Sequence, residues 1–210
     1  MSHATSQIAG VILAGGQSSR LGPGSKAMIQ LGDQPMIHHV IARLKSQVSP
    51  LLVSTQDAES EIDTLGLDIV EDAVKRHRGP LTGLYSAMRN VFESSDLEWM
   101  LLTPCDAPFI PLNLAELLFS EAITSEKPVS VACYELVPQP TFSLWHRSVF
   151  PHVKSVVTTE GKGGLMYMLD RLPYCTTEWP NARVAPFFNV NTRADLQMAE
   201  RLLDSDTAAD

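Results

Sequence analysis

The chain has 210 residues, 44% of them hydrophobic and 19% charged, and its formal net charge is −8. This length suits one α/β domain with a sizeable core, and the negative charge argues against non-specific nucleic-acid binding. No apolar stretch is long enough to span a membrane, and the first residues lack the basic-then-apolar pattern of a secretory signal. Three cysteines without a Cys-x-x-Cys pair indicate neither a disulfide framework nor a zinc site. We therefore expect a cytoplasmic protein.

Predicted strands and helices alternate along the chain. Short runs of β-forming residues predict strands over residues 11–13, 51–53, 69–70, 99–103, 129–134, 140–145 and 187–191. Apolar residues at helical spacing predict helices over residues 36–48, 84–92, 114–118, 149–157, 165–171 and 192–203. We expect a single-domain α/β fold with a mostly parallel, Rossmann-like sheet and helices on both faces. The domain is expected to cover residues 8–203, between flexible termini at 1–7 and 204–210.

Local sequence features refine this pattern. The segment over 140–145 is predicted to be extended, in an antiparallel or edge position. The break Pro138-Gln139-Pro140 is interpreted as a loop within the domain. Glycine and proline predict a turn over 79–83, and glycines predict a mobile loop over 161–164. Thr192, with Asp195 three residues later, resembles a capping box at the start of the last helix.

A glycine-rich loop follows the first strand. Between residues 15 and 26 it contains four glycines, three serines and the cations Arg20 and Lys26. Glycines let backbone N–H groups approach an anion closely. Arginine can hold phosphate oxygens as a fork, and lysine adds a point charge. The loop matches neither the Walker motif nor the dinucleotide fingerprint. We interpret it as a polyphosphate-binding loop, with an ordinary surface turn as the alternative.

Further polar residues fall at predicted strand ends, where ligands bind in parallel α/β sheets. They are Ser54, Asp72, Asp106, Asn189 and Asn191. Asp106 suits Mg²⁺, a hard cation that takes one or two protein oxygens together with phosphate and water. The alternative for Asp106 is an Asx turn before Pro108. For Asp72, guanine contact, support of the metal and helix capping all remain open.

Several motifs resemble one family in the same order, over nearly the whole chain. The motifs are Leu13-Ala14-Gly15-Gly16, Arg20, Gly22, Lys26, Glu71-Asp72, Gly79-Pro80-Leu81-Thr82-Gly83, Cys105-Asp106-Ala107-Pro108-Phe109, Gln139-Pro140-Thr141-Phe142 and Phe188-Asn189-Val190-Asn191-Thr192. This order is similar to that of the molybdenum cofactor guanylyltransferases, which transfer GMP from GTP to the phosphate of Mo-molybdopterin and release pyrophosphate. The resemblance implies a fold of the nucleotide-diphospho-sugar transferase type, GTP as substrate and Mg²⁺ as cofactor.

The resemblance also implies roles for individual residues. Its nucleotide contacts fall on Leu13, Ala14, Gly15, Gly16, Lys26, Ser54, Asp72 and Asp106. Its pterin-substrate contacts fall on Gly79, Pro80, Leu81, Gly83, Lys162, Asn189 and Asn191. Asp106 is the implied metal ligand, and Arg20, Lys26 and Asp106 are the implied catalytic residues. Implied partners are GTP, Mo-molybdopterin, molybdenum cofactor delivery proteins and apo-molybdoenzymes, with no nucleic acid and no membrane.

The chemistry that these residues indicate is electrostatic. The attacking phosphate monoester is already an anion, so no general base is required, whereas cations must bring anions together and stabilise the leaving pyrophosphate. Two other enzyme activities remain as alternatives to guanylyl transfer: a cytidylyltransferase that acts on the same cofactor and a sugar-phosphate nucleotidyltransferase. A third is a nucleotide-binding adaptor without catalysis in cofactor delivery, which Ser25 keeps open because the family usually has aspartate before the loop lysine.

Overall fold

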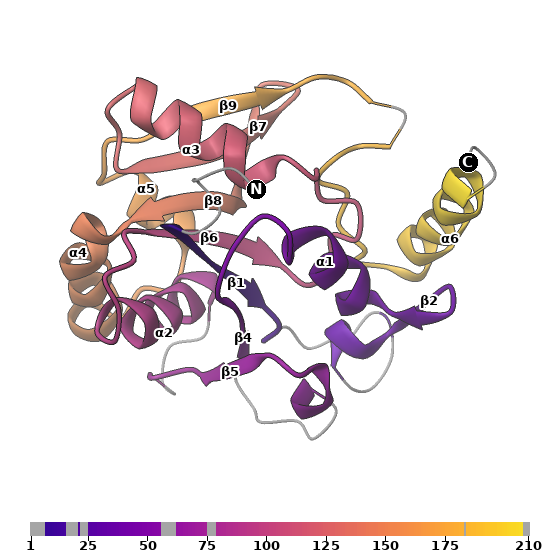
Figure 1. The fold of residues 1–210 in the computed structure, drawn as a ribbon, viewed down its shortest axis with the longest axis horizontal. Coiled ribbons are helices and arrows are strands. Elements are labelled where there is room, and N and C mark those ends of the chain that lie inside the picture. The colour runs from indigo at the N-terminus through magenta and orange to yellow at the C-terminus, as the bar shows by residue number, and fades with distance from the viewer. Residues whose placement is uncertain are drawn as a thin grey trace.

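A seven-stranded sheet forms the centre of the protein in this computed structural model, which describes residues 7–15, 21, 25–55, 62–74, 79–182 and 184–207 (Figure 1). The strands are β1 (Ile8–Leu13), β4 (Leu51–Thr55), β5 (Asp68–Glu71), β6 (Trp99–Pro104), β7 (Val129–Tyr134), β8 (Val137–His146) and β9 (Cys175–Trp179). Their spatial order is β5-β4-β1-β6-β8-β7-β9. Strand β8 runs antiparallel to its neighbours β6 and β7, and the other pairs in the sheet are parallel. The predicted fold class is therefore confirmed.

Helices cover both faces of the sheet. They are α1 (Met36–Leu44), α2 (Pro80–Phe92), α3 (Leu114–Thr124), α4 (Phe150–Ser155), α5 (Leu165–Leu169) and α6 (Arg193–Thr207). A π-helical turn, Val156–Glu160, follows α4. Helices α1 and α3 pack on one face, and α2, α4 and α5 pack on the other. Among the described residues, no helix is both long and apolar enough to cross a membrane.

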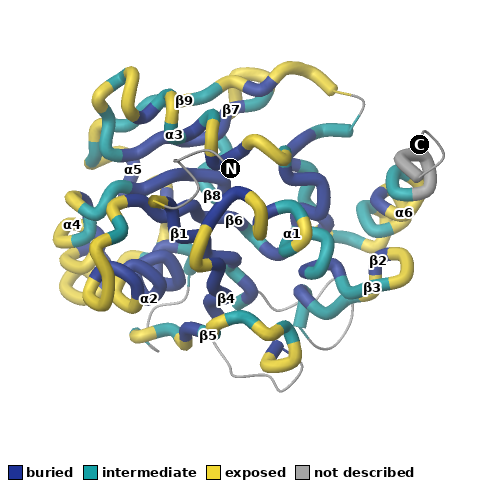
Figure 2. The backbone as a smooth tube through the Cα atoms, viewed as in Figure 1, coloured by how far each residue is buried: buried dark blue, intermediate teal, exposed yellow. Residues whose placement is uncertain are grey.

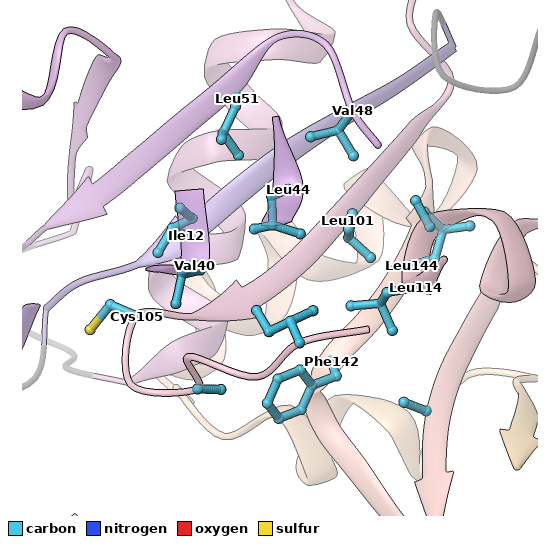
Figure 3. Packing of buried hydrophobic residues seen from close by; sticks show 14 of the residues in the cluster. Ile12, Val40, Leu44, Val48, Leu51, Leu101, Cys105, Leu114, Phe142 and Leu144 are labelled. Atoms are coloured by element: carbon cyan, nitrogen blue, oxygen red, sulfur yellow. The ribbon is translucent and has the colours of Figure 1, made fainter. Parts of the chain in front are cut away.

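The central strands supply apolar side chains to both faces. In β1, Ile8 and Ile12 point into the cluster beneath α1 and α3, whereas Ala9 and Val11 point towards α2. Figure 3 shows the first of these clusters, in which Val40 and Leu44 of α1 pack against side chains of the sheet, among them Ile12, Leu101 and Leu144 from β1, β6 and β8. Figure 2 shows the same strands as a buried centre beneath partly exposed helices. Because both faces are covered, β1 and β6 read as continuous apolar runs rather than as alternating ones.

A third, smaller apolar cluster lies beside the sheet. It joins α6 to the short hairpin of β2 (Gln30–Leu31) and β3 (Gln34–Pro35), as Figure 1 shows at the side of the molecule. Its buried members are Leu31, Met36, Phe109, Val190 and Ala199. The cluster therefore ties the C-terminal helix to the segments that follow β1 and β6.

Several predicted helix boundaries were wrong. For example, α3 continues to Thr124 beyond the predicted 114–118, and α6 continues to Thr207 beyond the predicted end at 203. The predicted turn over 79–83 is instead largely helical, because α2 begins at Pro80 and proline is tolerated at the first helical position. The helix after Pro35 ends at Leu44 rather than near Val48. It ends there because the N–H of Ser49 donates to the Ile8 carbonyl at 2.9 Å, which draws the chain out of the helix and into β4 beside β1.

The predicted strand over 187–191 is also wrong. The segment is irregular because both neighbouring positions of β6 are already taken by β1 and β8. It is held instead by the N–H of Val190, which donates to the Asp106 carbonyl at 2.8 Å, and by Phe187 and Phe188, which pack in different clusters. Strand β9, which is half-exposed and has little apolar content, and the two-residue strands β2 and β3 were not predicted. The loop predicted at Pro138-Gln139-Pro140 was wrong, because these residues form the first part of β8.

Candidate functional site

The carboxyl ends of β1 and β6 mark the point where the order of strands changes direction. From β1 the chain goes to β4 and β5 on one side and returns to β6 on the other. Leu13 and Pro104 are register partners at the ends of these two strands. Ligands bind at such a switch point in open α/β sheets. A cavity of about 270 Å³ is present there, lined by Leu13, Gly15, Asp72, Gly79, Pro80, Gly83, Pro104 and Thr141.

One wall of this cavity is the first turn of α2. A Cβ atom on Gly83 would lie 2.6 Å from Cδ2 of Leu13 and 3.0 Å from the Ser54 hydroxyl. A larger residue at position 83 would require the side chains of Leu13 and Ser54 to move, so glycine favours this close approach of α2 to the ends of β1 and β4. A Cβ atom on Gly79 would lie 2.5 Å from the carbonyl oxygen of Gly163, and the same oxygen accepts the N–H of Leu81 at 3.0 Å. The loop over 161–164 is thus fastened to the start of α2.

Asp72 contributes a half-buried carboxylate to the cavity. Its N–H donates to the Thr55 carbonyl at 3.2 Å, and the N–H of the next residue, Ala73, donates to the Ser86 hydroxyl at 2.9 Å. The Ser54 hydroxyl donates to Oδ1 of Asp72 at 3.4 Å. Burial raises the pKa of Asp72 to about 6, although the Ser54 hydrogen bond lowers it in part. Asp72 therefore changes charge just below neutral pH.

Lys26, Asp106 and Asn191 meet in a second group of side chains. The Lys26 ammonium forms an ion pair with Oδ2 of Asp106, and these two side chains are 12% and 15% exposed. The same ammonium donates to Oδ1 of Asn191 at 2.6 Å. Lys26 opens a short 3₁₀ turn, Asp106 follows β6, and Asn191 precedes α6. The fold thus gathers three predicted site residues from segments far apart in the chain.

The predicted capping box at α6 is confirmed. Oδ2 of Asp195 accepts the N–H of Thr192 at 2.8 Å, and the N–H of Asp195 donates to the Thr192 hydroxyl at 3.2 Å. Oδ2 also accepts the N–H of Asn191 at 3.0 Å. Partial burial raises the pKa of Asp195, but hydrogen bonds from Asn191 and Thr192 and the charge of Lys26 outweigh it and hold this pKa below its usual value.

Asp106 is suited to bind a divalent cation. Its Oδ1 is buried, and no donor to it is found in the described part of the chain. Oδ1 of Asn189 is buried and likewise without a described partner. Within the described ranges, no group of three or more His, Cys, Asp or Glu residues could hold a metal. A single carboxylate with a spare oxygen fits Mg²⁺, which takes most of its ligands from phosphate and water.

The remaining predicted site residues line the cavity, are buried, lie at the surface or fall outside the described residues. Leu13, Gly15, Asp72, Gly79, Pro80 and Gly83 line the cavity together, so predicted nucleotide and pterin contacts line the same cavity. Ala14 and Ser54 are buried, and Leu81 is buried in the core beneath α2. Lys162 is exposed, with its ammonium 5.8 Å from the centre of the Tyr167 ring. Gly16 and Arg20 lie outside the described residues.

Cys105, next to Asp106, is a buried thiol rather than a nucleophile. Burial and the negative charge of Asp106 together raise the pKa of this thiol to about 12, so it stays protonated at neutral pH. Pro104 and Thr141 also line the cavity, although neither was predicted to be a site residue. Pro104 could have been found because it directly follows a predicted strand, and Thr141 because it lies within a family motif.

Comparison with known proteins identifies the family. A family model described as the MobA-like NTP transferase domain matches residues 10–175. A molybdenum cofactor guanylyltransferase of Rhodopseudomonas palustris is 32% identical over 193 residues, which cover 91% of this chain and 90% of that protein. A molybdenum cofactor guanylyltransferase of Brucella ovis is 31% identical over 207 residues, which cover 93% of this chain and 92% of that one.

Solved structures show the same fold. The crystal structure of molybdopterin-guanine dinucleotide biosynthesis protein A from Archaeoglobus fulgidus superposes with a TM-score of 0.79 at 20% identity, covering 94% of this chain and 99% of that one. A CMP:2-keto-3-deoxy-manno-octonic acid synthetase in complex with CTP superposes with a TM-score of 0.72 at 19% identity, covering 96% of this chain and 100% of that one. At these identities the likeness concerns the fold alone. The match of the family model over most of the chain shows that this protein belongs to the MobA-like NTP transferase family.

Proposed function

We propose that the protein transfers GMP from GTP to the phosphate of Mo-molybdopterin and releases pyrophosphate, as a molybdenum cofactor guanylyltransferase. The observation that carries this proposal is the grouping of Lys26, Asp106 and Asn191 near a cavity at the switch point of the sheet. The curated relatives that resemble this chain over more than 90% of its length carry the same activity in their names. A cytoplasmic location is consistent with three free thiols, at Cys105, Cys133 and Cys175. Delivery proteins and apo-molybdoenzymes are the proposed protein partners.

In this reaction a phosphate oxygen of the acceptor attacks the α-phosphorus of GTP. A new P–O bond forms there, and the bond from the α-phosphorus to the bridging oxygen of pyrophosphate breaks. The acceptor phosphate is already ionised, so the site needs cations rather than a base. Lys26 supplies one fixed cation, and Arg20 is proposed as a second. Mg²⁺, held by Asp106 when bound, would neutralise part of the charge on the phosphate oxygens.

The cavity at the switch point is the proposed binding site for the guanine base of GTP. Asp72, Gly79 and Pro80 are among the residues that line it. An ionised carboxylate accepts two hydrogen bonds, and a guanine base presents adjacent N–H donors on its Watson–Crick edge. We assign the guanine contact to Asp72 on this complementarity.

The first test of the function is a comparison of nucleotides. Purified protein with Mg²⁺ and Mo-molybdopterin should release pyrophosphate and form the dinucleotide with GTP, and much less with CTP, ATP or UTP. Transfer of CMP in excess of GMP would show a cytidylyltransferase. Binding of GTP without release of pyrophosphate would show an adaptor. Turnover with a sugar phosphate in place of molybdopterin would show a different acceptor.

Removal of the Lys26 charge should impair the reaction locally. We expect Lys26→Ala to lower kcat/KM for GTP at least about tenfold, because a charge-assisted bond to phosphate contributes roughly 1.5–3 kcal/mol. Lys45→Ala is the matched control, since Lys45 is exposed after α1 and the change in net charge is the same. We expect less than about a twofold effect from it. Equal losses in both variants would assign the effect to overall charge, and melting temperatures check that both variants are folded.

Asp106→Asn tests the metal site. The amide keeps the shape of the side chain and can still accept from Lys26, but it lacks the charge that attracts Mg²⁺. We expect GMP transfer to fall by about a hundredfold or more, with the metal supplying several kcal/mol at the transition state. Binding of Mn²⁺ in the presence of GTP, followed by electron paramagnetic resonance, should be lost in parallel. Asp96→Asn removes the same charge from an exposed position and should retain both properties. Mn²⁺ binding that survives in Asp106→Asn would refute the assignment.

The raised pKa of Asp72 predicts a dependence of GTP affinity on pH. Above about pH 6 its carboxylate is ionised and accepts from the base, whereas below this pH it becomes protonated and loses that capacity. Lowering the pH from 7.5 to 5.5 should therefore weaken binding about fourfold, measured by calorimetry without metal. The phosphate groups of GTP also titrate in this range, so Asp72→Asn supplies the baseline. This variant should bind more weakly at pH 7.5 and lack the fourfold component. The same pH profile in both proteins would exclude Asp72 from base recognition.

A further inference from the structure

The N-terminus of α6 carries one hydrogen bond more than a capping box requires. In an ordinary box, the side chain at the third helical position accepts the N–H of the capping residue, and the capping hydroxyl accepts in return. Asp195 and Thr192 form both of these bonds. Oδ2 of Asp195 also accepts the N–H of Asn191, the residue before the cap, at 3.0 Å. The carboxylate thus holds two successive N–H groups and fixes the backbone at Asn191.

The side chain of Asn191 connects this backbone to the proposed catalytic group. Its Oδ1 lies 2.6 Å from Nζ of Lys26, on an ammonium that also pairs with Asp106. The neighbouring Val190 is fully buried, and its N–H donates to the Asp106 carbonyl. The segment is therefore held on one side by the loop after β6 and on the other by Asp195. Asn191 itself is exposed, so little packing contributes to holding its amide.

We propose that Asp195 is a positioning residue, which acts through Asn191 to hold the ammonium of Lys26 beside Asp106. A lysine side chain has a flexible four-carbon stem, and it directs its charge only where fixed acceptors restrain it. Asp106 supplies one acceptor and Asn191 the second. Loss of the Asp195 carboxylate releases the backbone of Asn191 and with it the second acceptor. The Lys26 side chain then loses more conformational entropy when it binds a triphosphate, so GTP binds more weakly. This inference rests on the proposed function in that Lys26 contacts the phosphates of GTP.

If Asp195 only stabilised helix α6, its substitution would have a different effect. A helix cap stabilises the whole helix, and either half of a capping box contributes to that effect. Thr192→Ala removes the capping hydroxyl and leaves the bond from the Asn191 N–H to Asp195 in place. Asp195→Ala removes the carboxylate that accepts from Thr192 and from Asn191, and leaves the Thr192 hydroxyl on the backbone N–H of residue 195. The packing of α6 through Ala199 is untouched in either variant. The two variants therefore have similar effects on the cap and differ in what they do to Asn191.

The experiment is a double-mutant cycle with a matched cap control. GTP affinity is measured by calorimetry, and kcat and KM for GMP transfer are measured on Asp195→Ala, Asn191→Ala, the double variant and Thr192→Ala. Both cap variants should lose roughly 2–4 °C in Tm. Asp195→Ala should bind GTP about tenfold more weakly, and Thr192→Ala less than about twofold. On the Asn191→Ala background, Asp195→Ala should cause almost no further loss. Asp195→Asn, which keeps an acceptor oxygen, should recover most of the affinity.

Equal loss of GTP affinity in Thr192→Ala and Asp195→Ala would overturn the inference, because the effect would then follow the helix cap. Additive losses for Asp195 and Asn191 would also overturn it, since Asp195 would then act independently of the amide. If Asp195→Ala does not fold, Asp195→Ser replaces it in the cycle, and Asp195→Asn remains the variant that should recover the affinity. A wild-type protein that binds GTP but transfers no GMP would contradict the proposed function, while the cycle of affinities would still decide the inference on Asp195.

Discussion

The ion pair between Lys26 and Asp106 is the contact on which the arrangement of the site depends. Both side chains are largely shielded from solvent, so each needs the opposite charge of the other. The pair joins the segment that follows the glycine-rich loop to the loop after β6, and Asn191 adds the segment before α6. The position of the Lys26 side chain is already restrained before a polyanion binds. Binding therefore costs little additional conformational entropy of this side chain.

The sheet explains why these segments meet. Strands β1 and β6 lie side by side in parallel, so the loops that follow them leave the same edge of the sheet. The close approach of α2 at Gly83 brings its first turn over the ends of β1 and β4, and the cavity lies between these elements. The small cluster around Val190 attaches α6 to the loop after β6. The packing of α6, which lies outside the main sheet, therefore helps to position Asn191 beside Lys26 and Asp106.

Charge, rather than a nucleophile or a base, dominates the described site. The Cys105 thiol beside Asp106 is kept protonated by burial and by the neighbouring carboxylate. Asp72 has a pKa near 6 because burial disfavours its charge, so its ionisation responds to what binds in the cavity. A transfer between two phosphate groups requires neutralisation and alignment of anions, and these side chains are suited to that task.

The sequence alone determined the fold class, the family and most of the elements. Apolar runs such as 99–103 and the helical spacing after Pro35 are local signals that depend on burial and backbone period. The capping box at Thr192 and Asp195 could also be predicted, because it is a short pattern with a direct physical meaning. The phosphate-binding role of the glycine-rich loop and the metal-binding role of Asp106 stay predictions. The tertiary structure decided what depends on neighbours in space. Residues 187–191 have the apolar content of a strand, but the sheet offers no free position beside β6. The pairing of Lys26 with Asp106 and Asn191, and the link from Asn191 to Asp195, join residues up to 165 positions apart. No local pattern encodes such contacts, because they form only when strand order and helix packing bring the segments together.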